Sequence, residues 1–278
     1  GDLDILLATQ GDDKIIFYES DGAADPSFSA TTITSSADGI YSVYAKDMDN
    51  DGDLDILSAS ANDDKIAWYE SNGAADPSFT ARTIATSADG AASVFAADLD
   101  GDGDQDVISA SLTDNTVAWY ENGLSAFGSH SFTAADIATS ADGAQDVHIV
   151  DLDNDGDLDI VSVSYNDDAI AWYENDGASN PSFTAADIAT SADGAISVFA
   201  ADMDNDGDMD IVSASYLDDT IAWYENDGAA NPSWSAANIA TSADGVHSVF
   251  IVDIDGDGDM DIISASYLDD TIAWYEND

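Results

Sequence analysis

A nine-residue acidic loop recurs along this 278-residue chain and constrains its fold more than any other feature. In the first complete copy, aspartates stand at alternate positions from Asp47 to Asp55, and Gly52 stands at the sixth position. The five copies start 51, 53, 51 and 51 residues apart, at Asp47, Asp98, Asp151, Asp202 and Asp253. A partial sixth copy begins at Gly1. A fixed period of this length predicts a solenoid or a propeller.

Each period contains four apolar or alternating segments separated by polar turns. In one repeat these segments are residues 196–202, 210–215, 220–225 and 234–241. They are rich in Val, Ile, Phe, Trp, Tyr and Thr, and a period of two fits them better than 3.6, so we expect β-strands. No segment combines helical periodicity with capping residues, which excludes a helical solenoid. Four antiparallel strands with short turns are typical of a propeller blade.

The predicted fold is therefore all-β, a β-propeller of four-stranded antiparallel blades with about six repeats of ~51 residues. We expect residues 1–278 to form one domain. The pattern contains five first, six second, six third and five fourth strands, so the first and last blades are incomplete. The alternative is part of a seven-bladed propeller.

The charge balance narrows the classes of partner. The chain has 4 Lys and Arg against 58 Asp and Glu, a net charge of −54, so nucleic acid and anionic membrane surfaces are poor partners. Hydrophobic residues make up 45 %, which is enough for a buried core. No apolar run approaches the roughly 20 residues needed to span a bilayer. There is no cysteine, so neither disulfides nor thiolate metal sites are available.

The acidic loops carry the chemistry of a hard cation. Ca²⁺ binds six to eight oxygen ligands, and carboxylates at loop positions 1, 3 and 5 can converge when a glycine at position 6 permits a sharp bend. Position 7 would offer its carbonyl and position 9 would close the site. We therefore predict about five Ca²⁺ ions. Their ligands would be Asp47, Asp49, Asp51, Asp53 and Asp55; Asp98, Asp100, Asp102, Asp104 and Asp106; Asp151, Asp153, Asp155, Asp157 and Asp159; Asp202, Asp204, Asp206, Asp208 and Asp210; and Asp253, Asp255, Asp257, Asp259 and Asp261.

An EF-hand shares the opening of this pattern but requires a glutamate at position 12 and flanking helices. Here position 12 is a serine in every copy, and both flanks are predicted strands. The repeated Asp-x-Asp-x-Asp-Gly-x-x-Asp loop between two strands instead resembles the FG-GAP and VCBS-type repeats of integrin-α-like β-propellers. The resemblance covers the whole chain. It implies Ca²⁺ in hairpin loops on one rim of the propeller and a ligand on the opposite face.

Variation among the repeats points to a separate candidate site. The residue at the start of each first strand differs between copies, and strand polarity places it on the rim opposite the acidic loops. Tyr41, Gln145 and His247 are the candidate ligand-binding residues, with Ala92 and Ile196 at the same position in the other repeats. The repeated Trp-Tyr pairs of the third strands, such as Trp68-Tyr69, are interpreted as packing between blades.

We expect a non-catalytic protein, because near-identical repeats supply few convergent, differing groups and no nucleophile elbow or phosphate loop is present. The predicted function is a calcium-binding extracellular or cell-surface binding and adhesion module, part of a larger polypeptide, that does not insert into membranes. The extracellular placement follows from the calcium available there and from the family resemblance. The alternatives are a lectin-like or polysaccharide-processing propeller and a purely structural scaffold, so the ligand is a protein or a glycan.

Overall fold

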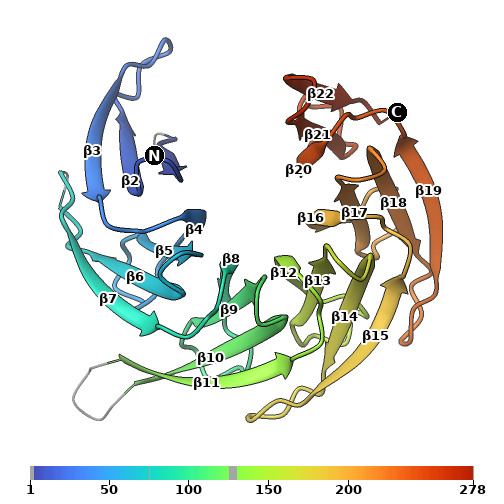
Figure 1. The fold of residues 1–278 in the computed structure, drawn as a ribbon, viewed down its shortest axis with the longest axis horizontal. Coiled ribbons are helices and arrows are strands. Elements are labelled where there is room, and N and C mark those ends of the chain that lie inside the picture. The colour runs from blue at the N-terminus through green and yellow to red at the C-terminus, as the bar shows by residue number, and fades with distance from the viewer. Residues whose placement is uncertain (1–2, 75, 125–129, 278) are drawn as a thin grey trace. The chain divides into compact units, whose positions relative to one another are not determined.

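The structure is a computed structural model that describes residues 3–74, 76–124 and 130–277. These residues form 22 β-strands, as the repeat pattern predicts, and the fold is an all-β six-bladed propeller (Figure 1). The first strands of the blades are β4 (Ile40–Lys46), β8 (Ala91–Ala97), β12 (Ala144–Val150), β16 (Ala195–Ala201) and β20 (Val246–Val252). The second strands are β1 (Ile5–Thr9), β5 (Asp55–Ser60), β9 (Asp106–Ser111), β13 (Asp159–Ser164), β17 (Asp210–Ser215) and β21 (Asp261–Ser266).

The remaining strands complete the blades. The third strands are β2 (Lys14–Ser20), β6 (Lys65–Ser71), β10 (Thr116–Leu124), β14 (Ala169–Asn175), β18 (Thr220–Asn226) and β22 (Thr271–Tyr275). The fourth strands are β3 (Phe28–Thr34), β7 (Phe79–Ala85), β11 (His130–Ala138), β15 (Phe183–Ala189) and β19 (Trp234–Ala240). Four sheets have four antiparallel strands in chain order, whereas β1-β2-β3 and β20-β21-β22 have three. The strands predicted at residues 196–202, 210–215, 220–225 and 234–241 agree with β16, β17, β18 and β19 to within one residue.

Backbone contacts divide the chain into two compact units. Unit 1 comprises residues 1–97 and 103–139, and unit 2 comprises residues 98–102 and 140–278. The expectation of a single domain stays a prediction. Within the described residues, no helix is long and apolar enough to cross a membrane.

The second strands show why the blades pack as they do. In β5, β9, β13 and β17 every residue is buried, so these strands have two buried faces rather than one. Within each unit a second strand packs against the first strand of the following blade, as β5 packs on β8 and β17 on β20. The third strands place Trp68 in one hydrophobic cluster of unit 1 and its neighbour Tyr69 in another. Both clusters contain residues of two consecutive blades, which confirms the predicted packing between blades.

Each first strand contains a β-bulge near its start. In β4 the pairing with β5 shifts between Ile40 and Ser42, so Tyr41 is the extra residue. The same shift occurs around Ala92, Gln145, Ile196 and His247. A bulge leaves one residue outside the ladder and changes the direction of its side chain. The position that varies most in sequence is therefore also the position that the sheet constrains least.

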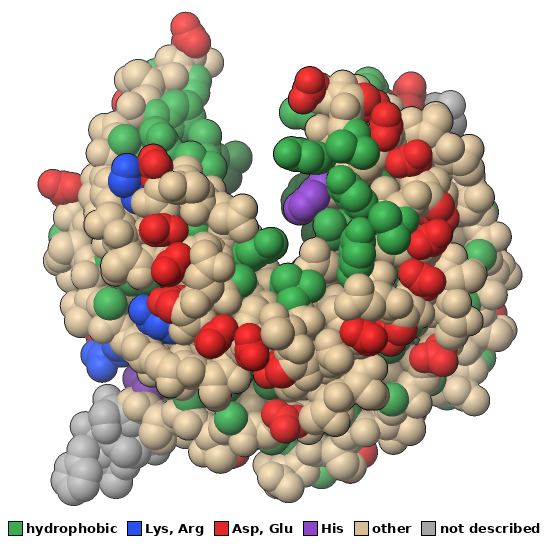
Figure 2. Space-filling view, in the orientation of Figure 1, with side chains coloured by type: hydrophobic (Ala, Val, Ile, Leu, Met, Phe, Trp, Pro, Cys, Tyr) green, Lys and Arg blue, Asp and Glu red, His purple; other side chains and the backbone are tan. Residues whose placement is uncertain are grey.

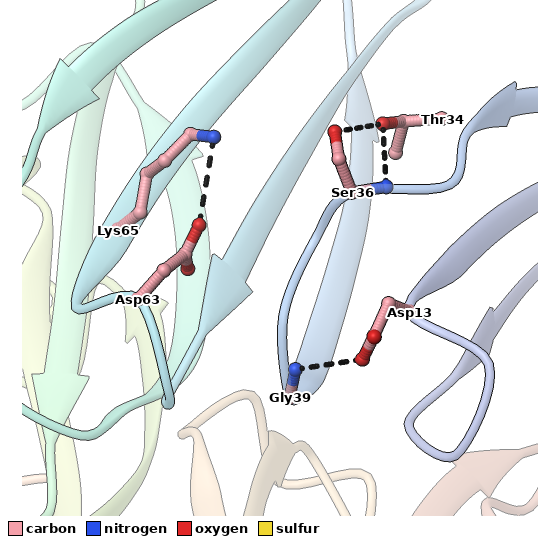
Figure 3. Close-up of polar contacts among 6 residues, drawn as sticks. All are labelled: Asp13, Thr34, Ser36, Gly39, Asp63 and Lys65. Atoms are coloured by element: carbon pink, nitrogen blue, oxygen red, sulfur yellow. Dashed lines mark hydrogen bonds and ion pairs between the residues drawn. The ribbon is translucent and has the colours of Figure 1, made fainter.

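At the ends of the strands remote from the acidic loops, an aspartate in the turn between the second and third strands links consecutive blades. Figure 3 shows the first case, in which the Asp13 carboxylate accepts a hydrogen bond from Gly39 N at 3.1 Å. Asp13 has a φ of 56°, a left-handed conformation that Asp tolerates better than most residues. The following blades of each unit repeat this bond, in the pairs Asp64–Gly90, Asp168–Gly194 and Asp219–Gly245. Nearby, Lys65 forms an ion pair with Asp63 at 3.6 Å.

Candidate metal-binding loops

Each acidic loop joins the first strand of a blade to the second and curls around its own carboxylates. In the first complete loop, the Asp47 carboxylate accepts hydrogen bonds from Asp51 N at 3.1 Å and from Gly52 N at 3.0 Å. Gly52 has a φ of 96°, a conformation that residues with a Cβ rarely adopt. This backbone requirement explains the glycine at position 6 of every copy. The curl turns the alternate carboxylates toward one another.

The structure brings three carboxylates together in every loop. One oxygen from each member of a triad lies within 4.8 Å of the others. Positions 1 and 3 belong to all five triads, and the third member is position 5 in three loops and position 9 in two. The triads are Asp47, Asp49 and Asp51; Asp98, Asp100 and Asp102; Asp151, Asp153 and Asp159; Asp202, Asp204 and Asp206; and Asp253, Asp255 and Asp261. Each donor set consists of hard oxygens, which suits Ca²⁺.

The third complete loop contains a buried carboxylate oxygen that accepts no hydrogen bond from the described residues. Asp151 Oδ2 accepts a hydrogen bond from Gly156 N at 3.1 Å. Asp151 Oδ1 is buried, and no group in the described residues donates a hydrogen bond to it. A buried charged oxygen without a partner is costly, and here two more carboxylates lie close to it. A bound cation would supply the missing interaction.

The aspartate at position 9 also has a structural role. Asp55 is 1 % exposed, and its two oxygens accept hydrogen bonds from Ser71 N at 2.7 Å and from Met48 N at 3.2 Å. The carboxylate thereby ties its own loop to the end of the third strand. Burial raises the pKa of Asp55 to about 6, even though these backbone N–H groups lower it. Burial likewise raises the pKa values of Asp159 and Asp210 to about 6.

The side chain at position 7 faces a neighbouring loop rather than its own triad. Asn154 Nδ2 donates to Asp208 Oδ1 at 2.7 Å, and Asn205 Nδ2 donates to Asp259 Oδ1 at 2.7 Å. The position 7 carboxylates belong to none of the triads found among the described residues. If position 7 contributes a ligand to the ion, we expect that ligand to be its backbone carbonyl oxygen. The sequence prediction of all 25 ligand positions stays a prediction.

An asparagine at the end of the third strand fixes adjacent loops in unit 2, a role that sequence reasoning missed. Asn226 Nδ2 donates to Leu152 O at 2.9 Å, in the loop of the preceding blade, and to Met209 O at 3.0 Å in its own. Asn175 bonds Leu99 O and Leu158 O in the same way. The recurrence of Glu-Asn at the ends of these third strands is the only sequence signal for it.

The candidate ligand-binding residues lie at the other end of the strands, as predicted. Tyr41 is 46 % exposed on unit 1, whereas Gln145 and His247 lie on unit 2. Gln145 is half-buried and His247 is exposed. Each of the three is the extra residue of a bulge. Their part in ligand binding stays a prediction.

Sequence comparison identifies the class of repeat. A model of the FG-GAP-like repeat matches residues 1–58, 47–109, 98–162, 151–213 and 202–264, and the chain belongs to this family. Each match ends just after an acidic loop, and the following match begins at the start of that same loop. No curated protein matches the chain.

Solved structures share the fold at low sequence identity. A lectin of Agrocybe aegerita that recognises non-reducing terminal N-acetylglucosamine is 18 % identical, with a TM-score of 0.60 over 99 % of this chain and 80 % of the lectin. A protein from Lactobacillus plantarum is 15 % identical, with a TM-score of 0.51 over 95 % of this chain and 81 % of that one. The Dos1 propeller is 10 % identical, with a TM-score of 0.57 over 97 % of this chain and 64 % of that chain. At these identities the likeness concerns the fold alone.

Proposed function

We propose that this protein is a calcium-stabilised, non-catalytic binding or adhesion module that acts outside the cell or at its surface as part of a larger polypeptide. The carboxylate triads in all five complete loops support calcium, and the buried Asp151 Oδ1 is the observation that carries this proposal. About five Ca²⁺ ions would each replace carboxylate repulsion with attraction and would hold the first and second strands of a blade together.

Ligand binding is proposed at the opposite ends of the strands, at the bulge positions of Tyr41, Gln145 and His247. These positions differ between blades, whereas the acidic loops are nearly uniform, and specificity requires differing side chains. Acidic composition argues against nucleic acid and anionic membranes as partners, so a protein or a glycan remains. Substituting Tyr41, Gln145 and His247 together by alanine should abolish binding of an identified ligand. Retained binding would contradict this placement.

Calorimetric titration of chelator-treated protein tests the calcium proposal. We expect about five sites, and fewer than about four would contradict the proposal. Because an ion that binds only the folded state stabilises it, each site should contribute about 2.7 kcal/mol when Ca²⁺ is present at 100 times its Kd. Chelation should therefore lower the melting temperature clearly.

A pair of single variants locates one of the sites. Asp151→Asn should remove one site from the titration and reduce the stabilisation by calcium. In the presence of chelator the same variant should be at least as stable as the wild type, because a neutral amide relieves the repulsion in the triad. Asp187→Asn, on the exposed fourth strand β15, changes the net charge equally and should leave the number of sites unchanged.

A further inference from the structure

Three tyrosines recur at one position of unit 2, the first residue after the second strand. Tyr165, Tyr216 and Tyr267 follow β13, β17 and β21, at the ends remote from the acidic loops. The rings of Tyr165 and Tyr216 lie 6.4 Å apart between centroids, and Tyr267 is 70 % exposed. In unit 1 the same position holds Gln10, Ala61 and Leu112. The aromatic row is therefore specific to unit 2.

Backbone hydrogen bonds fix the turns that carry these tyrosines. Tyr216 N donates to Gly194 O at 2.9 Å, and Leu217 N donates to Asp193 O at 3.2 Å. Gly194 has a φ of 67°, and a Cβ there would lie 2.7 Å from Leu217 Cγ. Leu217 nevertheless remains 52 % exposed. Apolar and aromatic surface is thus displayed next to the variable bulge residue of the same blade.

The charged side chains of unit 2, around the three tyrosines, are acidic with no Lys or Arg among them. All four basic residues of the chain lie in unit 1, so unit 2 has no Lys or Arg. Burial raises the pKa of Asp218 and the charge of Asp193 raises it further, and Asp167 beside Asp142 shows the same pattern. Figure 2 shows hydrophobic side chains gathered over β16, β17 and β20 with carboxylates around them, while the blue side chains lie over strands of unit 1.

We propose that Tyr165, Tyr216 and Tyr267 form a docking surface for an arginine-bearing polypeptide segment. A tyrosine face attracts a guanidinium or ammonium group, and Arg also stacks on aromatic rings. The neighbouring carboxylates accept the hydrogen bonds that such a donor-only group must make. Unit 2 offers an anionic ligand no Lys or Arg. The inference rests on the proposed function in placing a ligand at this end of the strands, and it adds the chemistry of the partner.

The test measures binding of three peptides of equal length, an Arg-Gly, a Lys-Gly and a Glu-Gly repeat, to the full chain in saturating Ca²⁺. We expect the Arg peptide to bind several-fold more tightly than the Lys peptide at equal charge, and the Glu peptide not to bind. The triple variant Y165L/Y216L/Y267L leaves the charge unchanged and introduces leucine, the residue that follows β9 in unit 1. It should weaken the Arg peptide on the order of tenfold and remove the difference between Arg and Lys.

Two further variants control for folding and position. Y165F/Y216F/Y267F keeps the rings and should bind like the wild type. Leu112→Ala changes the equivalent position of unit 1 and should have no effect on binding. Equal binding of the Arg and Lys peptides, or full affinity in the leucine variant, would overturn the proposal, as would tyrosine-dependent binding of a neutral glycan without peptide binding. The calcium titration does not depend on peptide binding. If the arginine peptide does not bind, the titration still tests the calcium proposal separately.

Discussion

The first two repeats of unit 1 and the repeats of unit 2 build the same blade with different polar contacts. At the end of the third strand, the first two repeats have Ser20 and Ser71, whereas unit 2 has asparagines. Ser71 Oγ accepts a hydrogen bond from Gly73 N at 3.3 Å, as Asn226 Oδ1 does from Gly228 N at 3.0 Å. Only the asparagine continues into the loop of the preceding blade. The serine therefore preserves the turn, and the asparagine adds a bond between blades.

The two units differ similarly in the middle of the first strand. Tyr44 and Phe95 of unit 1 pack with ring centroids 4.3 Å apart. In unit 2 the same position holds His148, Phe199 and Phe250, and His148 lies 4.7 Å from Phe199. One imidazole thus replaces a phenyl ring in an aromatic row. The comparison shows that the repeat tolerates polar substitutions where a neighbouring blade covers them, and each substitution gives a measurable difference between the units.

The largest expected effect concerns His148 and pH. Burial lowers the pKa of His148 to about 4, below its ordinary value of 6.5. Between pH 6.5 and pH 4 the unfolded chain binds a proton at this imidazole more readily than the folded protein does. Stability is therefore lost as pH falls from about 6.5 to about 4. The shift corresponds to about 3 kcal/mol. Chemical denaturation of the wild type and of His148→Phe between pH 7 and pH 4 should show this difference.

A transfer of the imidazole to unit 1 provides the control. Phe95→His places histidine at the equivalent position and should add acid sensitivity to that unit, whereas His247→Phe, at an exposed position, should not alter the pH profile. Parallel profiles for the wild type and His148→Phe would show that the imidazole does not contribute to acid unfolding. The carboxylates common to both proteins cancel in the difference.

The next effect concerns the asparagine bonds between blades. Asn226→Ser should retain the contact with Gly228 and lose both Nδ2 bonds, leaving Leu152 O and Met209 O without this donor. We expect a loss of about 2 kcal/mol, because each buried carbonyl without its bond costs about 1 kcal/mol or more. Urea denaturation in saturating Ca²⁺ measures it. The converse variant Ser71→Asn should be neutral or stabilising, and a cost below about 0.5 kcal/mol for Asn226→Ser would show that water replaces the amide.

A smaller effect should be equal in the two units, because the left-handed aspartate occurs in both. Asp64→Ala and Asp219→Ala each remove a bond to a backbone N–H, of Gly90 at 3.2 Å and of Gly245 at 2.9 Å. Each also places alanine at a φ above 50°. We expect each to cost about 2 kcal/mol or slightly less, and the asparagine variants to cost about half. Thermal melts compare them, with Asp187→Asn on β15 as the exposed control. A clear difference between Asp64→Ala and Asp219→Ala would contradict the equivalence.

The sequence is informative where one repeat determines a contact and less so where two repeats share it. The period of the acidic loops predicts the strands and triads because these lie within one hairpin. The bulges were not predictable, because the extra residue depends on the pairing register of two strands rather than on Tyr41 or Gln145 itself. The bond from Asn226 to Leu152 joins residues 74 apart. Similarly, nothing in the pair Asp63-Asp64 indicates which aspartate adopts the left-handed conformation and which faces Lys65.

The smallest expected effect concerns a contact that unit 1 has and unit 2 lacks. Arg82 on β7 lies 5.2 Å from the ring centroid of Trp68 and pairs with Glu70, whereas β15 and β19 have Ala186 and Ala237 opposite their tryptophans. Arg82→Ala therefore converts this position to the residue found in unit 2. Because the side chain is half exposed, we expect a loss of about 0.5–1 kcal/mol.

Salt separates the two parts of this contribution. The ion pair with Glu70 should weaken as ionic strength rises, whereas the stacking on Trp68 should persist, so Arg82→Lys should resemble Arg82→Ala more closely at high salt than at low salt. Denaturation of the three proteins at two ionic strengths measures this. A loss that disappears completely at high salt would assign the whole effect to the ion pair. In that case we would also expect an arginine peptide to bind unit 2 through its carboxylates rather than through stacking on tyrosine. Binding to Y165L/Y216L/Y267L distinguishes these two interactions, because this variant removes the rings and keeps the carboxylates.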